Sequence, residues 1–310
     1  MLAIEVKNIE KKYENGVKAL YGLNLNVKYG EIFSLLGQNG AGKSTLIRIL
    51  STYTNTTSGK VKMLGMDVEK DAEIIRFQIA CVAQQISLDT HLTLKENMLF
   101  QSQLYRIPKE EAKKRITKLL YEFALTSYSS YPISSFSGGI KRRADIALNL
   151  MSNPKILFLD EPTVGMDIQS RQIMWKMIKK IRDEFGTTVF LTTHYLEEAN
   201  ILSDTICILK DGRNVIQGTP EELRSIIQQN SIRISFNDNQ KTKIAYSKIR
   251  LTFFKRKVRL NKVSIDIESL DCQSDLEEIN KYLIKNSIQF SGIEIVQPTL
   301  EDAFLRLTKE

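Results

Sequence analysis

The segment GQNGAGKST, from Gly37 to Thr45, constrains the fold more than any other part of this sequence. It fits the pattern G-x-x-x-x-G-K-[ST], in which glycines let backbone N–H groups close around phosphate oxygens. The apolar run EIFSLL before it is typical of a buried strand, and STLIRIL continues as a helix whose N-terminus favours an anion. A glycine-rich turn that matches by chance is the alternative, but the flanking strand and helix argue against it. The segment therefore predicts a nucleotide-binding loop.

Two side chains of this loop carry the expected chemistry. Lys43 reaches the β and γ phosphates in such loops, and Ser44 offers its hydroxyl to Mg²⁺. The residues expected to surround the phosphates are Gly37, Gln38, Asn39, Gly40, Ala41, Gly42, Lys43, Ser44 and Thr45.

A second signal lies in KILFLDEP, where four apolar residues, Ile156 to Leu159, precede Asp160 and Glu161. A buried parallel strand delivers acidic groups in this way at its carboxyl end, which is where open α/β sheets bind ligands. We expect Asp160 to hold Mg²⁺, directly or through water, and Glu161 to orient and polarise the attacking water. Alone, such a strand is common and indicates no function. Its pairing with the phosphate loop favours the catalytic interpretation.

The chain has two histidines, His91 and His194. His194 follows the apolar run VFLTT, whose carboxyl end should open at the same edge of the sheet as Asp160. A neutral imidazole there can donate a hydrogen bond to a γ-phosphate oxygen. The alternative is a half-buried histidine in a turn between strand and helix. His91 lies in a polar stretch and receives no role.

More than a hundred residues separate the phosphate loop from the acidic strand, so we expect an inserted helical subdomain over about 86–152. Within it, KEEAKKRITKLLYEFAL has the three-four apolar spacing of a helix. The insert ends in SSFSGGIKRRADIALNLM, where Ser137, Gly138 and Gly139 open another helix. That helix start can hold further phosphate oxygens, and a simple helix cap is the alternative.

The order of these motifs resembles the ATP-binding cassette (ABC) transporter ATPases, from residue 1 to about 224. The shared motifs are the phosphate loop, the glutamine segment CVAQQ, the SGG helix, LFLDEPT, VGMD and the strand ending in His194. The resemblance implies an α/β fold, a P-loop NTPase core with the inserted helical subdomain, that binds ATP and Mg²⁺. GIKRRADIA and the ending QPTLEDAFLRLTKE are similar to the daunorubicin-resistance type, the drug- and antibiotic-export branch.

The resemblance also implies roles for residues that the pattern alone does not assign. Tyr13 would stack on the adenine, and Gln84 would contact Mg²⁺ and sense the membrane partner. The V-x-Q spacing selects Gln84 over its neighbour Gln85. His194 would be the γ-phosphate switch. The catalytic residues implied are Lys43, Gln84, Glu161 and His194.

ATP hydrolysis at a dimer interface is a further implication of the resemblance. The signature segment would be Phe136 to Ile140, and Gly165 to Asp167 would form the loop that crosses between subunits. The signature commonly ends in Gln, and Ile140 stands there in this chain, which weakens a contact rather than the assignment. Ser137 and Gly139 of one subunit would touch the γ-phosphate of the other, in a homodimer or a heterodimer with a related ATPase subunit.

Composition fits a soluble chain in a reducing compartment. The three cysteines show no metal-like spacing, and no apolar stretch approaches the roughly 18 residues of a membrane span. We do not expect the segment MLAIEVKNIEKKY to be a signal peptide, because it alternates like a strand and is quickly charged. A separate multi-span permease would therefore carry the substrate and dock near Gln84 and residues 86–105. We expect the chain to be cytoplasmic and peripheral on the inner face of the cell membrane.

After about Arg224 the pattern changes to a small α+β accessory domain over 230–310. SIRISF, VSIDIES and IQFSGIEIV are typical of three strands, and SDLEEINKYLIKN of a helix between the last two. Between Lys241 and Lys262 the basic residues accumulate without an acidic one, so a face of this domain is expected to approach an anionic membrane surface. A solvated basic edge strand is the alternative.

The expected function is to energise export of a drug, antibiotic or lipid-like substrate. One rival is a cytosolic ABC ATPase that acts on nucleic acid or ribosomes, for which the net charge of +8 leaves room. Such proteins usually carry two cassettes or a long coiled coil, and this sequence shows neither, so nucleic acid is not the expected partner. Another rival is a regulatory subunit with little turnover, against which Glu161 and His194 together argue.

Overall fold

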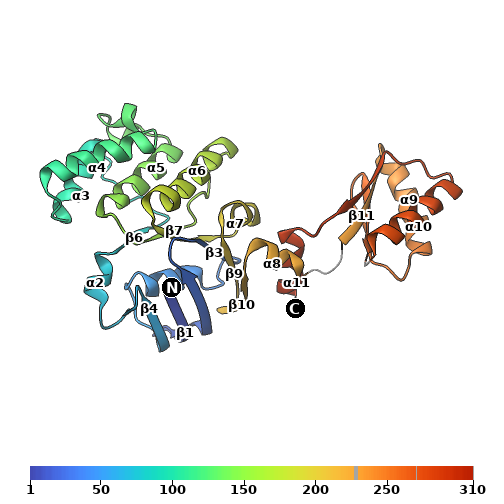
Figure 1. Cartoon of the computed structure of the whole chain (residues 1–310), viewed down its shortest axis with the longest axis horizontal. Coiled ribbons are helices and arrows are strands. Elements are labelled where there is room, and N and C mark those ends of the chain that lie inside the picture. Colours follow the sequence, from blue (N-terminus) through green and yellow to red (C-terminus); the bar gives the residue numbers. More distant parts are fainter. Residues whose placement is uncertain (227–229, 270, 310) are drawn as a thin grey trace. The chain divides into compact units, whose positions relative to one another are not determined.

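The structure, a computed structural model, describes residues 1–226, 230–269 and 271–309. The chain divides into two compact units, Met1–Pro220 and Glu221–Glu310 (Figure 1). Helix α8 (Pro220–Ser225) begins at this division. None of the described helices combines the length and apolarity that a membrane span needs.

A six-stranded sheet forms the centre of the first unit. Its strands, in sheet order, are β10 (Arg213–Gly218), β9 (Thr205–Lys210), β3 (Ile32–Leu36), β8 (Thr188–Thr193), β7 (Ile156–Asp160) and β6 (Ile79–Val82). All neighbours are parallel except β10, which pairs antiparallel with β9. The apolar runs predicted as strands are thus adjacent, and β3 and β8 are buried along their whole length.

One face of this sheet packs against a second, antiparallel sheet and the helix that follows the phosphate loop. The second sheet contains, in order, β2 (Lys18–Lys28), β1 (Leu2–Lys12), β4 (Ser58–Met63) and β5 (Met66–Asp67), and the helix is α1 (Lys43–Leu50). Their apolar side chains form one core with Phe33, Phe158 and Phe190 of the main sheet. The rings of Phe33 and Phe190 stack at 5.1 Å.

The other face is covered by helices, most of which belong to the insert. These elements are α3 (Leu94–Leu104), α4 (Lys109–Glu122), η1 (Thr126–Tyr128), η2 (Ile133–Ser135), α5 (Gly138–Asn149), η3 (Leu150–Ser152), α6 (Ile168–Phe185) and α7 (Leu196–Leu202). The short helix α2 (Ala72–Arg76) instead contributes Ile75 to the core on the first face. Helix α4 buries the predicted stripe of Ala112, Ile116, Leu119 and Leu120. The predicted fold, an α/β core with inserted helices, is confirmed.

The second unit has a split β-α-β-β-α-β topology. After α8 it runs through β11 (Asn230–Ser235), α9 (Asn239–Thr252), β12 (Val258–Leu260), β13 (Ser264–Ser269), α10 (Cys272–Lys285), β14 (Gly292–Val296) and α11 (Leu300–Lys309). The sheet order is β12-β13-β11-β14, with every pair antiparallel. Ile232, Ile234, Ile265 and Ile267 point from the sheet into the core that it shares with α9 and α10.

The sequence patterns missed α9 and β12. The edge-strand alternative for the basic stretch holds only for Val258–Leu260, because residues 239–252 form a helix. This helix buries Thr242, Ala245 and Ile249, a stripe with helical spacing but only one large apolar residue. Larger apolar side chains on its outer side obscure that stripe, which is why periodicity did not reveal it.

Candidate active site

The phosphate loop encloses the side chain of Lys43. Its ammonium group donates hydrogen bonds to the carbonyl oxygens of Gly37, at 2.7 Å, and Gln38, at 3.1 Å. Gly42 has a φ of +106°, and a Cβ there would lie 2.9 Å from the carbonyl oxygen of Ala19. A larger residue therefore cannot replace Gly42 without shifting the loop. The loop is closed around the lysine that we expect to meet the phosphates.

The carboxylate of Glu161 contacts the other predicted catalytic residues. Its oxygens lie 3.5 Å from the Lys43 ammonium and 3.3 Å from Nδ1 of His194. The side-chain amide of Gln84 donates a hydrogen bond to it at 3.0 Å. Both Lys43 and Glu161 are largely shielded from solvent, at 6% and 10% side-chain exposure, so their attraction is weakly screened. Three residues from distant parts of the sequence thus converge on the carboxylate of a fourth.

Strand register explains this convergence. Strands β3, β7 and β8 are parallel, and Asp160 pairs with Thr192 while Leu36 pairs with Thr193. The residues that follow these strands therefore emerge at the same edge of the sheet, as ligand-binding residues of open α/β sheets do. The phosphate loop, Glu161 and His194 all occupy this edge.

Thr192 holds the turn in which Glu161 lies. Glu161 has a φ of +47°, a left-handed conformation that costs a non-glycine residue about 1–3 kcal/mol. The Thr192 hydroxyl accepts a hydrogen bond from the Glu161 backbone N–H at 3.0 Å and donates one to the Asp160 carboxylate at 2.6 Å. Sequence reasoning missed Thr192, although a polar residue near the end of the buried run VFLTT was a usable signal.

The residues at this edge suit Mg²⁺. The Ser44 hydroxyl donates to the Asp160 carboxylate across 3.5 Å, so two oxygen ligands face each other. Gln84 donates to Glu161 through its amide nitrogen, which leaves its carbonyl oxygen as a further ligand. In the described part of the chain no cluster of three or more His, Cys, Asp or Glu residues could hold a metal. Mg²⁺ typically uses one or two carboxylates with substrate phosphates, so this donor set fits it.

Arg142 connects the signature helix α5 with this edge of the sheet, and sequence reasoning missed it. Its guanidinium donates hydrogen bonds to the backbone carbonyls of Ala83 and of Asp160, the latter at 2.9 Å. Burial lowers the pKa of Arg142, and burial raises the pKa of Asp145, whose carboxylate lies 3.9 Å away. The KRR sequence gave no sign of burial, because adjacent cations are usually solvated. Arg142 joins the segment before Gln84 to the carboxyl end of β7.

The predicted signature residues lie at the start of α5. The Ser137 hydroxyl caps this helix and accepts from the Ile140 N–H at 3.5 Å. Gly139 faces Ser170 of α6, and a Cβ on Gly139 would lie 3.2 Å from the Ser170 hydroxyl oxygen. Among the described residues, no hydrogen bond or ion pair joins residues 137–139 to Lys43 or Glu161. The chain does not bring its own predicted signature residues to Lys43, the lysine that we expect to bind phosphate.

Asp167 and Tyr13 occupy separate positions at the borders of the site. Asp167 caps α6, and hydrogen bonds from the hydroxyl and N–H of Ser170 lower the pKa of its carboxyl. The Tyr13 hydroxyl lies 3.2 Å from that of Thr45, so its ring borders the start of α1. Stacking of Tyr13 on adenine stays a prediction.

A buried hydrogen-bond network joins the segment after Glu161 to helix α7. One carboxylate oxygen of Glu198 accepts from the Thr163 hydroxyl at 2.7 Å and from the indole N–H of Trp175 at 3.1 Å. Thr163 and Glu198 are almost fully buried. The network therefore couples the chain just beyond Glu161 to helices α6 and α7.

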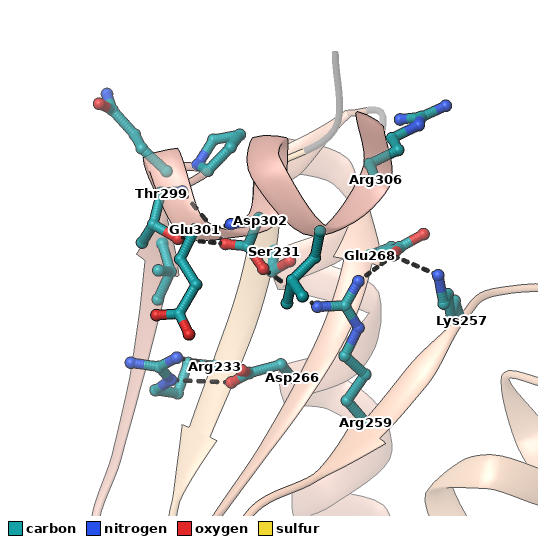
Figure 2. A pocket seen from close by; sticks show the side chains of 14 residues that line it. Ser231, Arg233, Lys257, Arg259, Asp266, Glu268, Thr299, Glu301, Asp302 and Arg306 are labelled. Carbon is teal, nitrogen blue, oxygen red and sulfur yellow. Dashed lines mark hydrogen bonds and ion pairs between the residues drawn. The ribbon is translucent and has the colours of Figure 1, made fainter. Parts of the chain in front are cut away.

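The second unit contains a cavity of about 750 Å³ between α11 and the polar face of its sheet (Figure 2). Arg233 pairs with Asp266 through two hydrogen bonds of 2.8 and 3.0 Å. Arg259 pairs with Glu268 and with Asp302 of α11, both at 3.2 Å. These opposite charges satisfy one another, so the cluster fastens α11 to the sheet and we assign it no ligand.

Fold and site together define a P-loop nucleotide-binding ATPase. The family model described as ABC transporter matches residues 20–164. The chain is 34% identical to a daunorubicin resistance ATP-binding protein of Streptomyces coeruleorubidus, over 99% of this chain and 96% of the relative. It is also 34% identical to a linearmycin resistance ATP-binding protein of Bacillus subtilis, over 98% of each chain. This chain belongs to the ABC transporter family, in which it resembles the daunorubicin-resistance ATP-binding proteins.

Solved structures agree with this assignment. A Clostridium perfringens subunit, part of the ABC transporter complex cbiONQ, has a TM-score of 0.68 at 26% identity, covering 82% of this chain and 96% of that one. A dimeric ATP-binding cassette in a post-hydrolysis state, bound to ADP and Pi, has a TM-score of 0.62 at 32% identity, covering 70% and 98%. The predicted family, fold, ATP binding and ATPase activity are confirmed.

Proposed function

We propose that this chain is the ATP-hydrolysing subunit of an exporter that moves a drug, antibiotic or lipid-like substrate through a separate permease. The convergence of Lys43, Gln84 and His194 on the Glu161 carboxylate is the observation that carries the hydrolytic part. The names of the relatives support export, since they include resistance to daunorubicin and linearmycin and Nod factor export. None of these names refers to ribosomes, so the nucleic-acid alternative is not adopted.

The residues of the site divide the work of hydrolysis. The Lys43 ammonium would bind the β and γ phosphates, and the neighbouring Glu161 carboxylate would orient water for in-line attack on the γ-phosphorus. The proton of that water moves toward Glu161, and His194 donates a hydrogen bond to a γ-phosphate oxygen. The bond between the γ-phosphorus and the bridging oxygen breaks, and ADP is the leaving group. Ser44, Asp160 and Gln84 would hold Mg²⁺, which would neutralise the negative charge that develops on ADP.

The nucleotide site is completed by a second copy or a related ATPase subunit. Each chain has one phosphate loop and one signature segment, and the signature of the same chain does not contact Lys43. The ADP-bound relative is dimeric. Ser137 and Gly139 of one subunit would therefore face the γ-phosphate bound by the other, with residues 165–167 crossing between them.

The chain would act at the inner face of the cell membrane, held there by the permease. Around α3, the segment predicted to dock with the permease leaves large apolar side chains in solvent. Ile86, Phe100 and Leu104 are 37%, 56% and 61% exposed. Exposed apolar groups gathered along one segment are typical of a protein-binding surface.

Mixed dimers test the composite site. Lys43→Ala and Ser137→Arg should each inactivate the homodimer, but in a mixed dimer both lesions fall in one site and the other site is intact. Random mixing should restore about a quarter of wild-type activity, because half of the dimers then carry one intact site of two. Lys43→Ala mixed with Glu161→Gln is the control, since each site then keeps one lesion and activity should not return. No recovery from the first pair, despite heterodimers detected by cross-linking, would contradict the composite site.

Export itself is tested in the organism that carries the chain. Cells that lack the chain should become more sensitive to at least one amphipathic antibiotic or drug. They should also accumulate that compound. The wild-type chain should restore resistance, whereas Glu161→Gln, produced at the same level, should not. Unchanged sensitivity and accumulation across a broad panel of such compounds would count against the exporter proposal.

A further inference from the structure

The solvent-exposed side of helix α9 in the second unit is unusually apolar. Its inner side buries Thr242, Ala245 and Ile249. Ile244 and Leu251 lie seven residues apart, two helical turns, and so share the side opposite this core. They are 62% and 78% exposed, and Phe254, just beyond the helix, is 74% exposed.

Basic side chains border this apolar strip on both sides. By helical geometry Lys241 and Lys248 lie along one border, and Lys243 and Arg250 along the other. All four are exposed, and residues 239–265 contain no Asp or Glu. In the part of the chain that the structure describes, Lys241, Lys243 and Lys248 enter no salt bridge with a carboxylate. No carboxylate among the described residues therefore neutralises their positive charge.

The neighbouring helix α10 provides an internal comparison. It packs on the same face of the sheet and also has an exposed isoleucine, Ile284, which is 68% exposed. Its charges are mixed, however, with Glu277 paired to Lys281 and Glu278 paired to Arg256. Of these two helices, therefore, only α9 combines an apolar strip with unbalanced positive charge.

We propose that this outer side of α9, which we call the basic face, binds an anionic phospholipid surface. We define the basic face as Lys241, Lys243, Ile244, Lys248, Arg250, Leu251 and Phe254. A helix with an apolar strip between rows of cations lies in the plane of a bilayer surface, with the strip among the acyl chains and the cations among phosphates. The inference extends the proposed location at the membrane, but it concerns lipid rather than the permease.

The arrangement favours lipid over nucleic acid. A nucleic-acid surface presents phosphates to cations, and in that case the middle of the basic face would be expected to be polar. Here the middle is occupied by Ile244 and Leu251, whose burial is favourable only in an apolar environment. A lipid surface interacts favourably with both features, because its phosphates attract the cations and its acyl chains bury the apolar strip.

Vesicle flotation of the full chain, without nucleotide or permease, tests the proposal. The chain should float with vesicles of phosphatidylglycerol and phosphatidylcholine, and much less with phosphatidylcholine alone. Lys241→Gln with Lys248→Gln should lower binding about twenty-five-fold, at about five-fold for each charge near the surface. Ile244→Ser with Leu251→Ser should also abolish flotation, and high salt should weaken wild-type binding.

Matched variants on α10 are the control. Ile284→Ser and Lys285→Gln change an equally exposed isoleucine and a cation, and flotation should stay at the wild-type level. All these variants change exposed residues outside the ATPase site, so ATPase activity should be unaffected. Normal ATPase activity without flotation of the wild-type chain would overturn the lipid proposal and leave the proposed function standing. Binding of duplex DNA that needs the lysines but not Ile244 and Leu251, with no flotation, would also overturn it.

Discussion

At the scale of single residues, the Glu161 carboxylate has two electrostatic roles that a glutamine cannot perform. It attracts the Lys43 ammonium, which lies 3.5 Å away, and it is expected to orient the attacking water. Glu161→Gln keeps the size of the side chain, so ATP should still bind. Turnover should fall by a factor of at least about 100, the scale of losing a general base. Phosphate release and equilibrium ATP binding, measured side by side, check both expectations.

Glu197→Gln is the matched control for this change. Glu197 lies on α7 near the site but is 68% exposed and only loosely paired with Arg171, at 3.9 Å. Its replacement should leave turnover unchanged. A Glu161→Gln chain that hydrolyses ATP near the wild-type rate would show that another group positions the water.

The residue types that perform chemistry through their side chains could be predicted from the sequence. Lys43, Glu161 and His194 each follow a recognisable apolar run or glycine pattern, and the structure brings them together. Thr192 and Arg142 could not be predicted in the same way. They act mainly through hydrogen bonds to backbone groups, and a sequence does not reveal which distant carbonyl or N–H will lie beside them.

At the scale of elements, strand β3 begins next to a buried acid whose ionisation opposes folding. Burial raises the pKa of Glu31 above its ordinary value of 4.5, although hydrogen bonds from the Lys28 N–H and the Thr205 hydroxyl act against this. A raised folded-state pKa means that the native chain binds the proton more tightly. The contribution of Glu31 to stability is therefore largest below pH 4.5 and declines as pH rises through its folded pKa.

Replacing Glu31 with Gln should remove this pH dependence. We compare the free energies of unfolding of the wild-type chain and of Glu31→Gln. The wild-type value minus the variant value should decrease as pH rises above 4.5, the ordinary pKa of a glutamate, and should then level off. Urea denaturation at a series of pH values measures it. Glu14→Gln, at an exposed position, serves as the control. Parallel pH profiles for the wild-type chain and Glu31→Gln would contradict the assignment.

Elements that bury a continuous apolar stripe were predictable, and α9 was not. Helix α4 shows its stripe of Ala112, Ile116 and Leu119 in the sequence. Helix α9 distributes large apolar residues over two opposite sides, because Ile249 faces the core and Leu251 faces solvent. Periodicity measures where apolar residues recur, so it fails for a helix with two apolar sides.

At the scale of the whole molecule, the two units have separate hydrophobic cores. Among the residues that the structure describes, the two cores of the first unit use none after Leu209, and the core of the second unit lies between Ile232 and Ile293. A chain of residues 1–226 should therefore fold and bind ATP with a dissociation constant within about two-fold of the full chain, the scatter expected for independent parts. Calorimetric titration and thermal unfolding measure this. A truncated chain that is unfolded, or that loses ATP binding, would show that the second unit supports the first.

The buried network of Thr163, Glu198 and Trp175 contains an intrinsic fluorophore, the indole of Trp175. Trp175 is the single tryptophan of the chain, and its indole donates to the same carboxylate oxygen as Thr163, two residues after Glu161. Indole emission depends on the polarity and hydrogen bonding around the ring. Any displacement of the segment after Glu161, or of α7 beyond His194, therefore changes the emission of one identified fluorophore. If nucleotide binding displaces either segment, the intrinsic fluorescence of the unlabelled chain should report it.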